Sequence, residues 1–120
     1  MNRLQALLND SLISTKHVEN AAIIDIKERK VSASTFGFNV PPENILNLIS
    51  AFSKNSLQVR KGGLCFKDKY YKCVRADKHS IYLQNVYGGL IVVKTKIFIL
   101  LATYSMGMYP SVCVEAVEKL

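Results

Sequence analysis

Between residues 64 and 104 one pattern repeats, a short apolar run followed by a turn, and this pattern constrains the fold more than any other feature. The runs are LCF, YYKCVRA, SIYLQNVY, LIVV and IFILLATY, and the breaks between them are Lys67-Asp68-Lys69, Asp77-Lys78-His79, Gly88-Gly89 and Lys94-Thr95-Lys96. Apolar, aromatic and β-branched runs joined by turns of two or three residues are typical of antiparallel hairpins. The sequence therefore predicts a meander of five strands.

The segments on either side of the meander predict three helices and one further hairpin. Leucines at 4, 7, 8 and 12 recur at helical spacing, and residues 21–26 and 31–35 are apolar runs around a polar break. Pro41-Pro42-Glu43 precedes an amphipathic run that ends near residue 54, and helical spacing follows Pro110. This order predicts a single domain, residues 1–120, of α+β class with helices packed on an antiparallel sheet.

The apolar residues predict the buried core, and the lengths of the apolar segments bear on the cellular compartment. The expected core residues are Leu4, Leu8, Ile24, Ile45, Leu48, Ile49, Phe52, Ile91, Val93 or its neighbour Val92, Ile99, Leu101 and Val117. The longest apolar region, residues 90–102, contains two lysines and is shorter than the roughly 20 residues of a membrane-spanning helix. The N-terminal segment lacks the apolar core of a signal peptide, so we expect a cytoplasmic protein.

Positive charge is concentrated in the middle of the chain. The formal net charge is +7. Residues 54–96 contain ten Lys or Arg and two Asp, which gives +8, whereas the other residues contain six basic and seven acidic side chains, which gives −1. This distribution predicts an electropositive region and an acidic partner. A solvated face that only keeps the protein soluble is the alternative.

The stretch KGGLCFKDKYYKCVRADK, residues 61–78, interleaves basic and aromatic side chains. Strand alternation places Lys67 and Lys69 in a turn, and Lys72 on the opposite face from Cys73 and Arg75. Near an anionic membrane each basic residue contributes on the order of 1 kcal/mol to binding. The candidate lipid-binding residues are Arg60, Lys61, Lys67, Lys69, Lys72, Arg75 and Lys78.

Two other interpretations of this stretch compete with lipid binding. Phe66 and Tyr71 are more simply explained as core or sheet residues, with the lysines protecting an edge. Exposed tyrosines in the same sheet can stack on bases, which makes an RNA-binding module the third hypothesis; the candidates are Tyr70, Tyr71, Tyr82 and Tyr87. No RNP-like sequence is present, so we expect no nucleic-acid partner.

Catalytic, metal and disulfide chemistry have little support in the sequence. His17 and His79 are isolated, and no nucleophile, carboxylate pair or phosphate-binding glycine loop has a convincing context. We therefore expect a binding protein that is not an enzyme, with no cofactor and no metal. Three cysteines without a CxxC spacing favour lone buried thiols in a reducing compartment, while a Cys65–Cys73 bridge stays open.

Two C-terminal segments resemble the profilin family. They are GGLIVVKTKIFILLATY at 88–104 and YPSVCVEAVEKL at 109–120. GGLCFKDKYYKCV resembles a profilin hairpin, and PPENILNLISAF resembles the second profilin helix. The resemblance implies a profilin-like antiparallel sheet with the N- and C-terminal helices packed together on one face. The positions that fall on the C-terminal pattern without a gap are Gly88, Gly89, Lys94, Thr95, Tyr104, Pro110, Cys113, Glu118 and Leu120.

Departures from the profilin pattern bear on the partners that the resemblance implies. Leu4 and Leu7 replace the aromatic residues, and Ser32 the tryptophan, with which profilins hold proline-rich ligands, and the last turns of the C-terminal helix are absent. No proline-rich ligand is therefore expected. The basic run on the actin-facing side is replaced by the uncharged residues 81–86, and Val93 replaces a lysine. The residual actin face would comprise Lys72, Arg75 and Lys94.

These departures, with HVENAAIID and FGFNVPP, are similar to the divergent fourth vertebrate (testis-type) branch of the family. The resemblance implies a monomeric, cytoplasmic, cytoskeleton-associated regulator with a role in spermatogenesis. Its implied partner is the acidic phospholipid membrane surface, with phosphoinositides and phosphatidic acid as ligands, and its binding to actin monomers and polyproline is weak or lost. The alternative is an actin-monomer-binding profilin that controls filament assembly.

Overall fold

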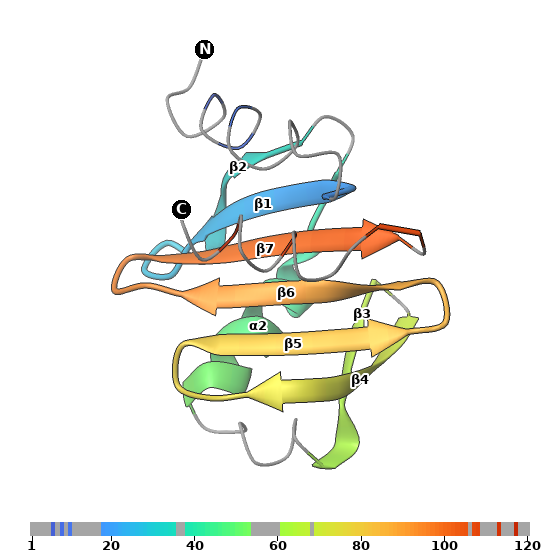
Figure 1. Ribbon diagram of the computed structural model, residues 1–120. Coiled ribbons are helices and arrows are strands. Elements are labelled where there is room, and N and C mark those ends of the chain that lie inside the picture. Colours follow the sequence, from blue (N-terminus) through green and yellow to red (C-terminus); the bar gives the residue numbers. More distant parts are fainter. Residues whose placement is uncertain are drawn as a thin grey trace.

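The computed structural model describes residues 6, 8, 10, 18–35, 38–53, 61–67, 69–105, 107–108, 113 and 117. Within this part of the chain seven strands form one sheet in the order β2-β1-β7-β6-β5-β4-β3, and every neighbouring pair is antiparallel (Figure 1). The elements are β1 (Asn20–Asp25), β2 (Lys30–Ser34), α2 (Pro42–Ser53), β3 (Leu64–Phe66), β4 (Lys69–Ala76), β5 (Ser80–Asn85), β6 (Gly88–Lys94) and β7 (Phe98–Ser105).

The predicted hairpin, second helix and five-stranded meander are all confirmed. The main difference concerns the end of β5, which the sequence predicted at Tyr87. The strand ends at Asn85, because the Asn85 Oδ1 atom accepts hydrogen bonds from the backbone N–H groups of Tyr87 at 2.8 Å and Gly88 at 3.1 Å and turns the chain. Val86 and Tyr87 therefore form the turn, and Gly88 begins β6.

The sheet buries apolar side chains on both faces. Alternate residues along each strand point to opposite faces, so Ile24 packs on the α2 side while its neighbour Ile23 packs on the other. Most expected core residues are buried; Ile49 and Val93 are half-buried, and Leu4 lies outside the described residues. The fully or almost fully buried members of the expected core are Leu8, Ile24, Ile45, Leu48, Phe52, Ile91, Val92, Ile99, Leu101 and Val117.

The described residues of the two terminal segments pack together. Leu8, Cys113 and Val117 are helical, and all three belong to the buried cluster on the face opposite α2. The expectation that the N- and C-terminal helices share one face of the sheet is thus confirmed. Burial raises the pKa of the Cys113 thiol to about 12, so this group stays protonated at neutral pH. In the described part of the chain, none of the helices has the length and apolar character needed to cross a membrane.

One residue of β4 interrupts the regular pairing with β5. Lys72 lies opposite Gln84 and Arg75 lies opposite Tyr82, so Val74 is an extra residue, a β-bulge. The bulge places Lys72 and Arg75 on the same face of the sheet. The prediction that they lie on opposite faces was wrong, because simple alternation counts every residue of a strand and a bulge removes one from the count.

Candidate binding surface

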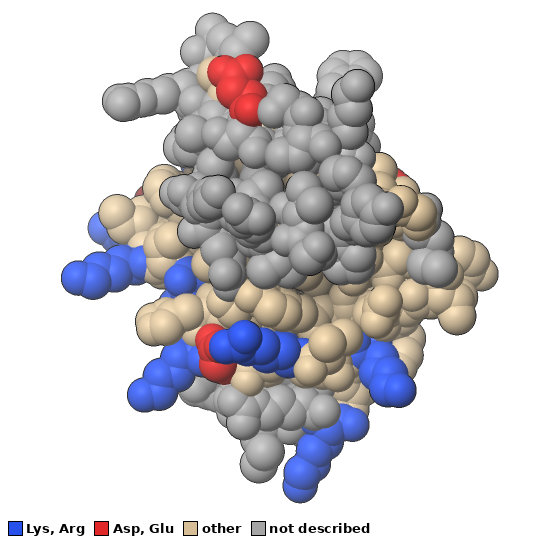
Figure 2. All heavy atoms as spheres, viewed as in Figure 1, with Lys and Arg blue, Asp and Glu red and all other residues tan. Residues whose placement is uncertain are grey.

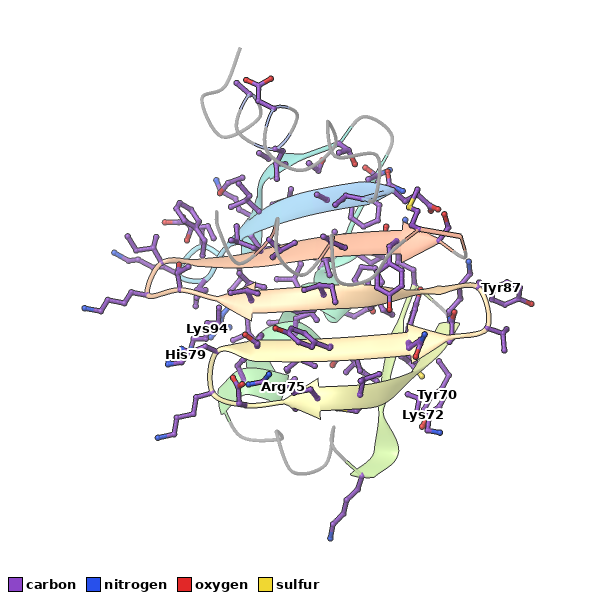
Figure 3. All side chains as sticks on the ribbon, viewed as in Figure 1. Tyr70, Lys72, Arg75, His79, Tyr87 and Lys94 are labelled. Carbon is purple, nitrogen blue, oxygen red and sulfur yellow. The ribbon has the colours of Figure 1, made fainter. Side chains whose placement is uncertain are left out.

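The predicted basic residues separate into two groups at opposite ends of β4. Lys67 and Lys69 lie at its start, whereas Arg75 and Lys78 lie near its end; a rise of about 3.3 Å per residue puts Lys69 and Arg75 about 20 Å apart. Figure 3 shows Tyr70, Lys72 and Tyr87 at one end of the sheet and Arg75, His79 and Lys94 at the other. We call Lys67, Lys69, Tyr70, Lys72, Val86 and Tyr87 the Tyr87 corner, and Arg75, Asp77, Lys78, His79 and Lys94 the Arg75 corner.

The Tyr87 corner combines lysines with exposed apolar side chains. Tyr70, Val86 and Tyr87 are 56%, 77% and 69% exposed. A groove of about 640 Å³ runs between them and is lined in part by Lys69 and Lys72. The Lys69 Nζ atom lies 5.5 Å from the centre of the Tyr87 ring, within the range of a cation–π contact. Three ammonium groups and an apolar turn therefore share one end of the sheet.

Asn85 fixes the turn of this corner to β4. Besides accepting the two backbone hydrogen bonds from the turn, its Nδ2 atom lies 3.4 Å from the Tyr70 carbonyl oxygen, and its side chain is hydrogen-bonded to the Tyr71 hydroxyl. Burial raises the pKa of Tyr71, the hydrogen bond with Asn85 opposes that shift, and the nearby Glu19 carboxylate adds to it. Tyr71 is therefore a neutral hydrogen-bonding group at physiological pH.

A cavity of about 350 Å³ opens beside the Tyr87 corner. It is partly open to solvent and is bordered by the β3–β4 turn, the β5–β6 turn and the adjoining ends of β1 and β7, and Glu19, Lys67, Lys69, Tyr71 and Asn85 contribute to its wall. The Lys67 Nζ atom lies 4.9 Å from the centre of the Phe38 ring, which also lines the cavity. Lys67 has a φ of 50°, in the left-handed region that side-chain-bearing residues rarely adopt.

The Arg75 corner differs from the Tyr87 corner, because the Asp77 carboxylate partly neutralises its positive charge. The Arg75 Nη2 atom lies 3.4 Å from Asp77 Oδ2, and the guanidinium group lies 5.8 Å from the Tyr82 ring centre. Asp77 Oδ1 accepts the N–H groups of His79 at 2.8 Å and Ser80 at 2.9 Å. These backbone hydrogen bonds, chiefly that from His79, and the Arg75 charge lower the pKa of Asp77.

The three residues proposed for a residual actin face are not all on one side of the sheet. Lys72 and Arg75 share the face opposite α2. Lys94 has the same strand parity as Leu90 and Val92, which pack on the α2 side, so it belongs to the other face. Its backbone N–H donates to the His79 carbonyl at 2.7 Å, which places it next to the β4–β5 turn.

The remaining predicted residues have varied positions. Phe66 and Tyr71 are buried, which confirms that they are core residues. Lys61 is exposed beside Gly62, whose carbonyl accepts a hydrogen bond from the Tyr70 hydroxyl, and Arg60 lies outside the described residues.

None of the three cysteines forms a disulfide. Cys113 is buried and Cys73 half-buried, but the expectation of a buried thiol is wrong for Cys65, which is exposed because its neighbours Leu64 and Phe66 turn toward the core. Among the residues with described positions, no group of three or more His, Cys, Asp or Glu side chains is arranged to hold a metal ion.

Sequence reasoning missed the exposed turn of the Tyr87 corner. Their β-propensity predicts that Val86 and Tyr87 belong to a strand. The available signal was the spacing Asn85-Val86-Tyr87-Gly88, since an asparagine side chain that accepts backbone N–H groups two and three residues later is a frequent turn former.

Comparison with known proteins assigns this chain to a family. The sequence model of the Profilin family matches residues 2–120. The chain belongs to the profilin family. Profilin-4 of Bos taurus is 54% identical over 120 residues, which are 100% of this chain and 93% of that protein. A crystal structure of profilin II from Acanthamoeba castellanii is 33% identical, covers 96% of this chain and 90% of its own, and has a TM-score of 0.86.

These values confirm both parts of the resemblance. The identity to Profilin-4 is well above the identity to the amoebal profilin, as expected for the divergent vertebrate branch. This profilin is therefore a member of a family of cytoskeletal, actin-regulating proteins that are not enzymes.

Two more distant structures contain bound partners. LokiProfilin1 in complex with rabbit actin is 15% identical, covers 99% of this chain and 92% of its own, and has a TM-score of 0.79. Mouse profilin IIa in complex with a double repeat from the FH1 domain of mDia1 is 14% identical, covers 98% of this chain and 96% of its own, and has a TM-score of 0.75. At these identities the likeness shows a common fold.

Proposed function

We propose that this profilin binds acidic phospholipid surfaces, phosphoinositides and phosphatidic acid among them, and that its binding to actin monomers and proline-rich peptides is weak or lost. The observation that supports this most is the Tyr87 corner, where three lysines surround the exposed Val86 and Tyr87. Tyrosine and aliphatic side chains favour the interfacial zone of a bilayer, and lysines beside them pair with lipid phosphates.

The distribution of positive charge also supports binding to an acidic membrane surface. Figure 2 shows Lys and Arg side chains distributed around the lower part of the visible face, where β4 and β5 lie in Figure 1. The long apolar stems of lysines allow their ammonium groups to reach phosphates while the turn approaches the surface. Three lysines at about 1 kcal/mol each would contribute about 3 kcal/mol from the Tyr87 corner alone. The proposal includes a cytoplasmic, monomeric protein and, from its likeness to the testis-type branch, a role in spermatogenesis.

Vesicle binding tests the proposal and its salt dependence. We expect co-sedimentation with vesicles that contain phosphatidylinositol bisphosphate or phosphatidic acid, and little with neutral phosphatidylcholine vesicles. Because the attraction is mainly electrostatic, binding should be lost as the screening length falls from about 10 Å at 0.1 M salt to about 3 Å at 1 M. Equal binding to neutral and acidic vesicles, or binding unchanged by salt, would contradict the proposal.

Actin binding is the alternative function, and the fold of the LokiProfilin1–actin complex is the reason to test it. The expectation of weak binding comes from the uncharged residues 81–86 and from Val93 in place of a lysine, and the Arg75–Asp77 ion pair and the different sheet faces of Lys72 and Lys94 support it. A titration of labelled actin monomers beside the vesicle assay separates the two functions. Micromolar actin affinity with no preference for acidic vesicles would favour the alternative.

Proline-rich peptides are expected to bind negligibly. The residues at the three positions that profilins fill with aromatic rings are Leu4, Leu7 and Ser32, and none offers a flat wall for a polyproline helix. Calorimetry with a decaproline peptide measures this directly and needs no tryptophan signal, which the chain lacks. A dissociation constant in the micromolar range would show that other residues have replaced the aromatic groove.

A further inference from the structure

Three turns lie together at the end of the sheet that is opposite the Tyr87 corner. They join β1 to β2, β6 to β7 and β4 to β5, and the order of the strands makes the β6–β7 turn the middle one (Figure 1). The Ile26 N–H group donates to the Ile97 carbonyl at 3.1 Å, which fixes the β1–β2 turn to the β6–β7 turn. The bond from the Lys94 N–H group to the His79 carbonyl fixes β6 to the β4–β5 turn. The three turns therefore form one continuous surface.

The β6–β7 turn holds Ile97 in an exposed position. The Thr95 Oγ1 atom accepts hydrogen bonds from the N–H groups of Ile97 at 3.3 Å and Phe98 at 2.9 Å. The N–H and carbonyl groups of Ile97 are thus both hydrogen-bonded, yet its side chain is 61% exposed. Because the backbone is already ordered, an apolar contact between this side chain and a partner costs little further conformational entropy.

Unneutralised basic side chains flank this isoleucine. Segments 25–30, 75–79 and 94–97 contain seven Lys or Arg and three Asp or Glu, which gives a formal charge of +4. Two of the three carboxylates serve their own turns, since Asp25 Oδ1 accepts the Glu28 N–H group at 2.9 Å and Asp77 pairs with Arg75. That pair is the one ion pair between residues with described positions, so the other six basic groups retain their capacity to bind an anion.

The middle of this surface combines cations with one aliphatic side chain. We call Lys27, Arg29, Lys30, Lys96 and Ile97 the Ile97 surface, and all five residues are exposed. Figure 2 shows Lys and Arg side chains projecting from the left side of the visible face, where the three turns lie in Figure 1. The Ile97 surface is thus a basic area with an apolar centre.

This combination narrows the class of partner. Single-stranded nucleic acids bind where exposed rings stack on bases, and the exposed tyrosines Tyr70 and Tyr87 lie at the other end of the sheet. An exposed isoleucine between cations instead fits a peptide that has an apolar residue among carboxylates. The six strands from β2 to β4 span about 24 Å at about 4.8 Å per step, the length of about seven extended residues.

We propose that the Ile97 surface docks an acidic peptide segment of a partner protein. An apolar residue of the segment packs on Ile97, and its carboxylates pair with the basic residues of the β1–β2 and β6–β7 turns. The proposal is independent of the proposed lipid binding, because the lysines of the Tyr87 corner lie at the opposite end of the sheet.

Synthetic peptides test the docking of an acidic segment. The probe has about nine residues, a central leucine flanked by glutamates, and is titrated into the full chain and followed by NMR. We expect it to shift the amide signals of Arg29, Lys96 and Ile97 and to leave those of Tyr70 and Tyr87 unchanged. Replacing the glutamates by glutamine, or the leucine by serine, should weaken binding at least about fivefold, because each change removes one of the two attractions.

Two triple variants of equal formal charge test the position of the site. Lys27→Glu, Arg29→Glu and Lys30→Glu combined should weaken binding of the leucine peptide at least about tenfold, because three attractions become repulsions. Replacing the three lysines of the Tyr87 corner by Glu should change it less than about twofold, because salt screens charges at that distance. The opposite order is expected for acidic vesicles, so failure of peptide docking and failure of lipid binding are distinguishable.

Ile97→Ser and Val86→Ser form a matched pair of single substitutions. Both side chains are exposed on turns, at opposite ends of the sheet, so both variants are expected to remain folded. Ile97→Ser should weaken the leucine peptide about fivefold and leave the serine peptide unchanged, whereas Val86→Ser should affect neither. Such a dependence of one change on the other is the signature of direct contact between Ile97 and the leucine.

Several results would overturn the proposal. The site is wrong if the acidic peptide shifts no amide of the Ile97 surface, if the glutamine peptide binds as tightly, or if both triple variants lose affinity equally. Equal binding of the leucine peptide to Ile97→Ser and the parent would also contradict it. A single-stranded oligonucleotide of the same charge is the last comparison: tighter binding at the same amides would show a nucleic-acid surface instead, and weaker binding would support the acidic peptide.

Discussion

Replacing Lys67, Lys69 and Lys72 together by Glu is expected to weaken binding to acidic vesicles by at least about a hundredfold. Three lysines at about 1 kcal/mol each supply about 3 kcal/mol, and about 1.4 kcal/mol corresponds to tenfold in affinity. The three introduced carboxylates add repulsion. Co-sedimentation at 0.1 M salt with vesicles that contain phosphatidylinositol bisphosphate measures the change, with circular dichroism to show that the fold is retained.

A second triple variant separates position from net charge. Lys27, Arg29 and Lys30 are exposed at the β1–β2 turn, and Figure 1 places that turn at the opposite end of the sheet from the β5–β6 turn. Three reversals of two charges each lower the formal net charge from +7 to +1 in either triple variant. We expect the β1–β2 variant to keep most of its vesicle binding.

Two outcomes of the comparison between the triple variants would contradict a lipid site at the Tyr87 corner. If both lose affinity equally, the protein is attracted by its overall charge and the Tyr87 corner has no special role. If neither loses affinity, the basic hairpin is only a solvated face, and a lipid site would have to be sought around Arg60, Lys61, Lys94 and Lys96.

Gly88→Ala is expected to produce the largest loss of stability among single substitutions at the site, at least about 2 kcal/mol. Gly88 has a φ of 150°, and a Cβ atom there would lie 2.0 Å from the Tyr104 carbonyl oxygen and 2.8 Å from the Ser105 Cα atom. Both are backbone atoms of the paired strand β7, so relief requires that β6 and β7 separate. Urea unfolding monitored by circular dichroism measures the free energy of unfolding.

Gly62→Ala is the matched control. A Cβ atom at Gly62 would meet no heavy atom within 4 Å. Its free energy of unfolding should stay within about 0.5 kcal/mol of the parent, as is usual for exposed substitutions. Equal stability of the two variants would show that β6 and β7 are not packed as closely at Gly88 as the structure indicates.

Much of the fold could be predicted from the sequence because local pattern and tertiary packing agree. The helical spacing of Ile45, Leu48 and Phe52 and the unbroken apolar runs of β6 and β7 each coincide with buried positions. The end of β5 could not be predicted in the same way. Val86 and Tyr87 have high β-propensity, but the side chain of Asn85 satisfies the turn N–H groups and overrides it.

The candidate site was only partly predictable. Counting basic and acidic residues along the sequence located the excess positive charge within residues 54–96, because the net charge of a segment is the sum of its side-chain charges. The division of this charge into two corners depends on which strand ends lie together in the sheet. The partial neutralisation of Arg75 depends on its ion pair with Asp77. The cavity depends on five segments far apart in sequence, which no local pattern records.

The extra residue at Val74 has a consequence for how profilins of this kind can diverge. With the bulge, Lys72 and Arg75 face the same layer; in a regular strand of the same length, with every residue retained, they would face opposite layers. The presence of a bulge thus acts as a variable independent of residue type. Gain or loss of a single bulge can redistribute a partner-facing surface between the two sides of a sheet, while composition, isoelectric point and the identities of the basic residues stay the same.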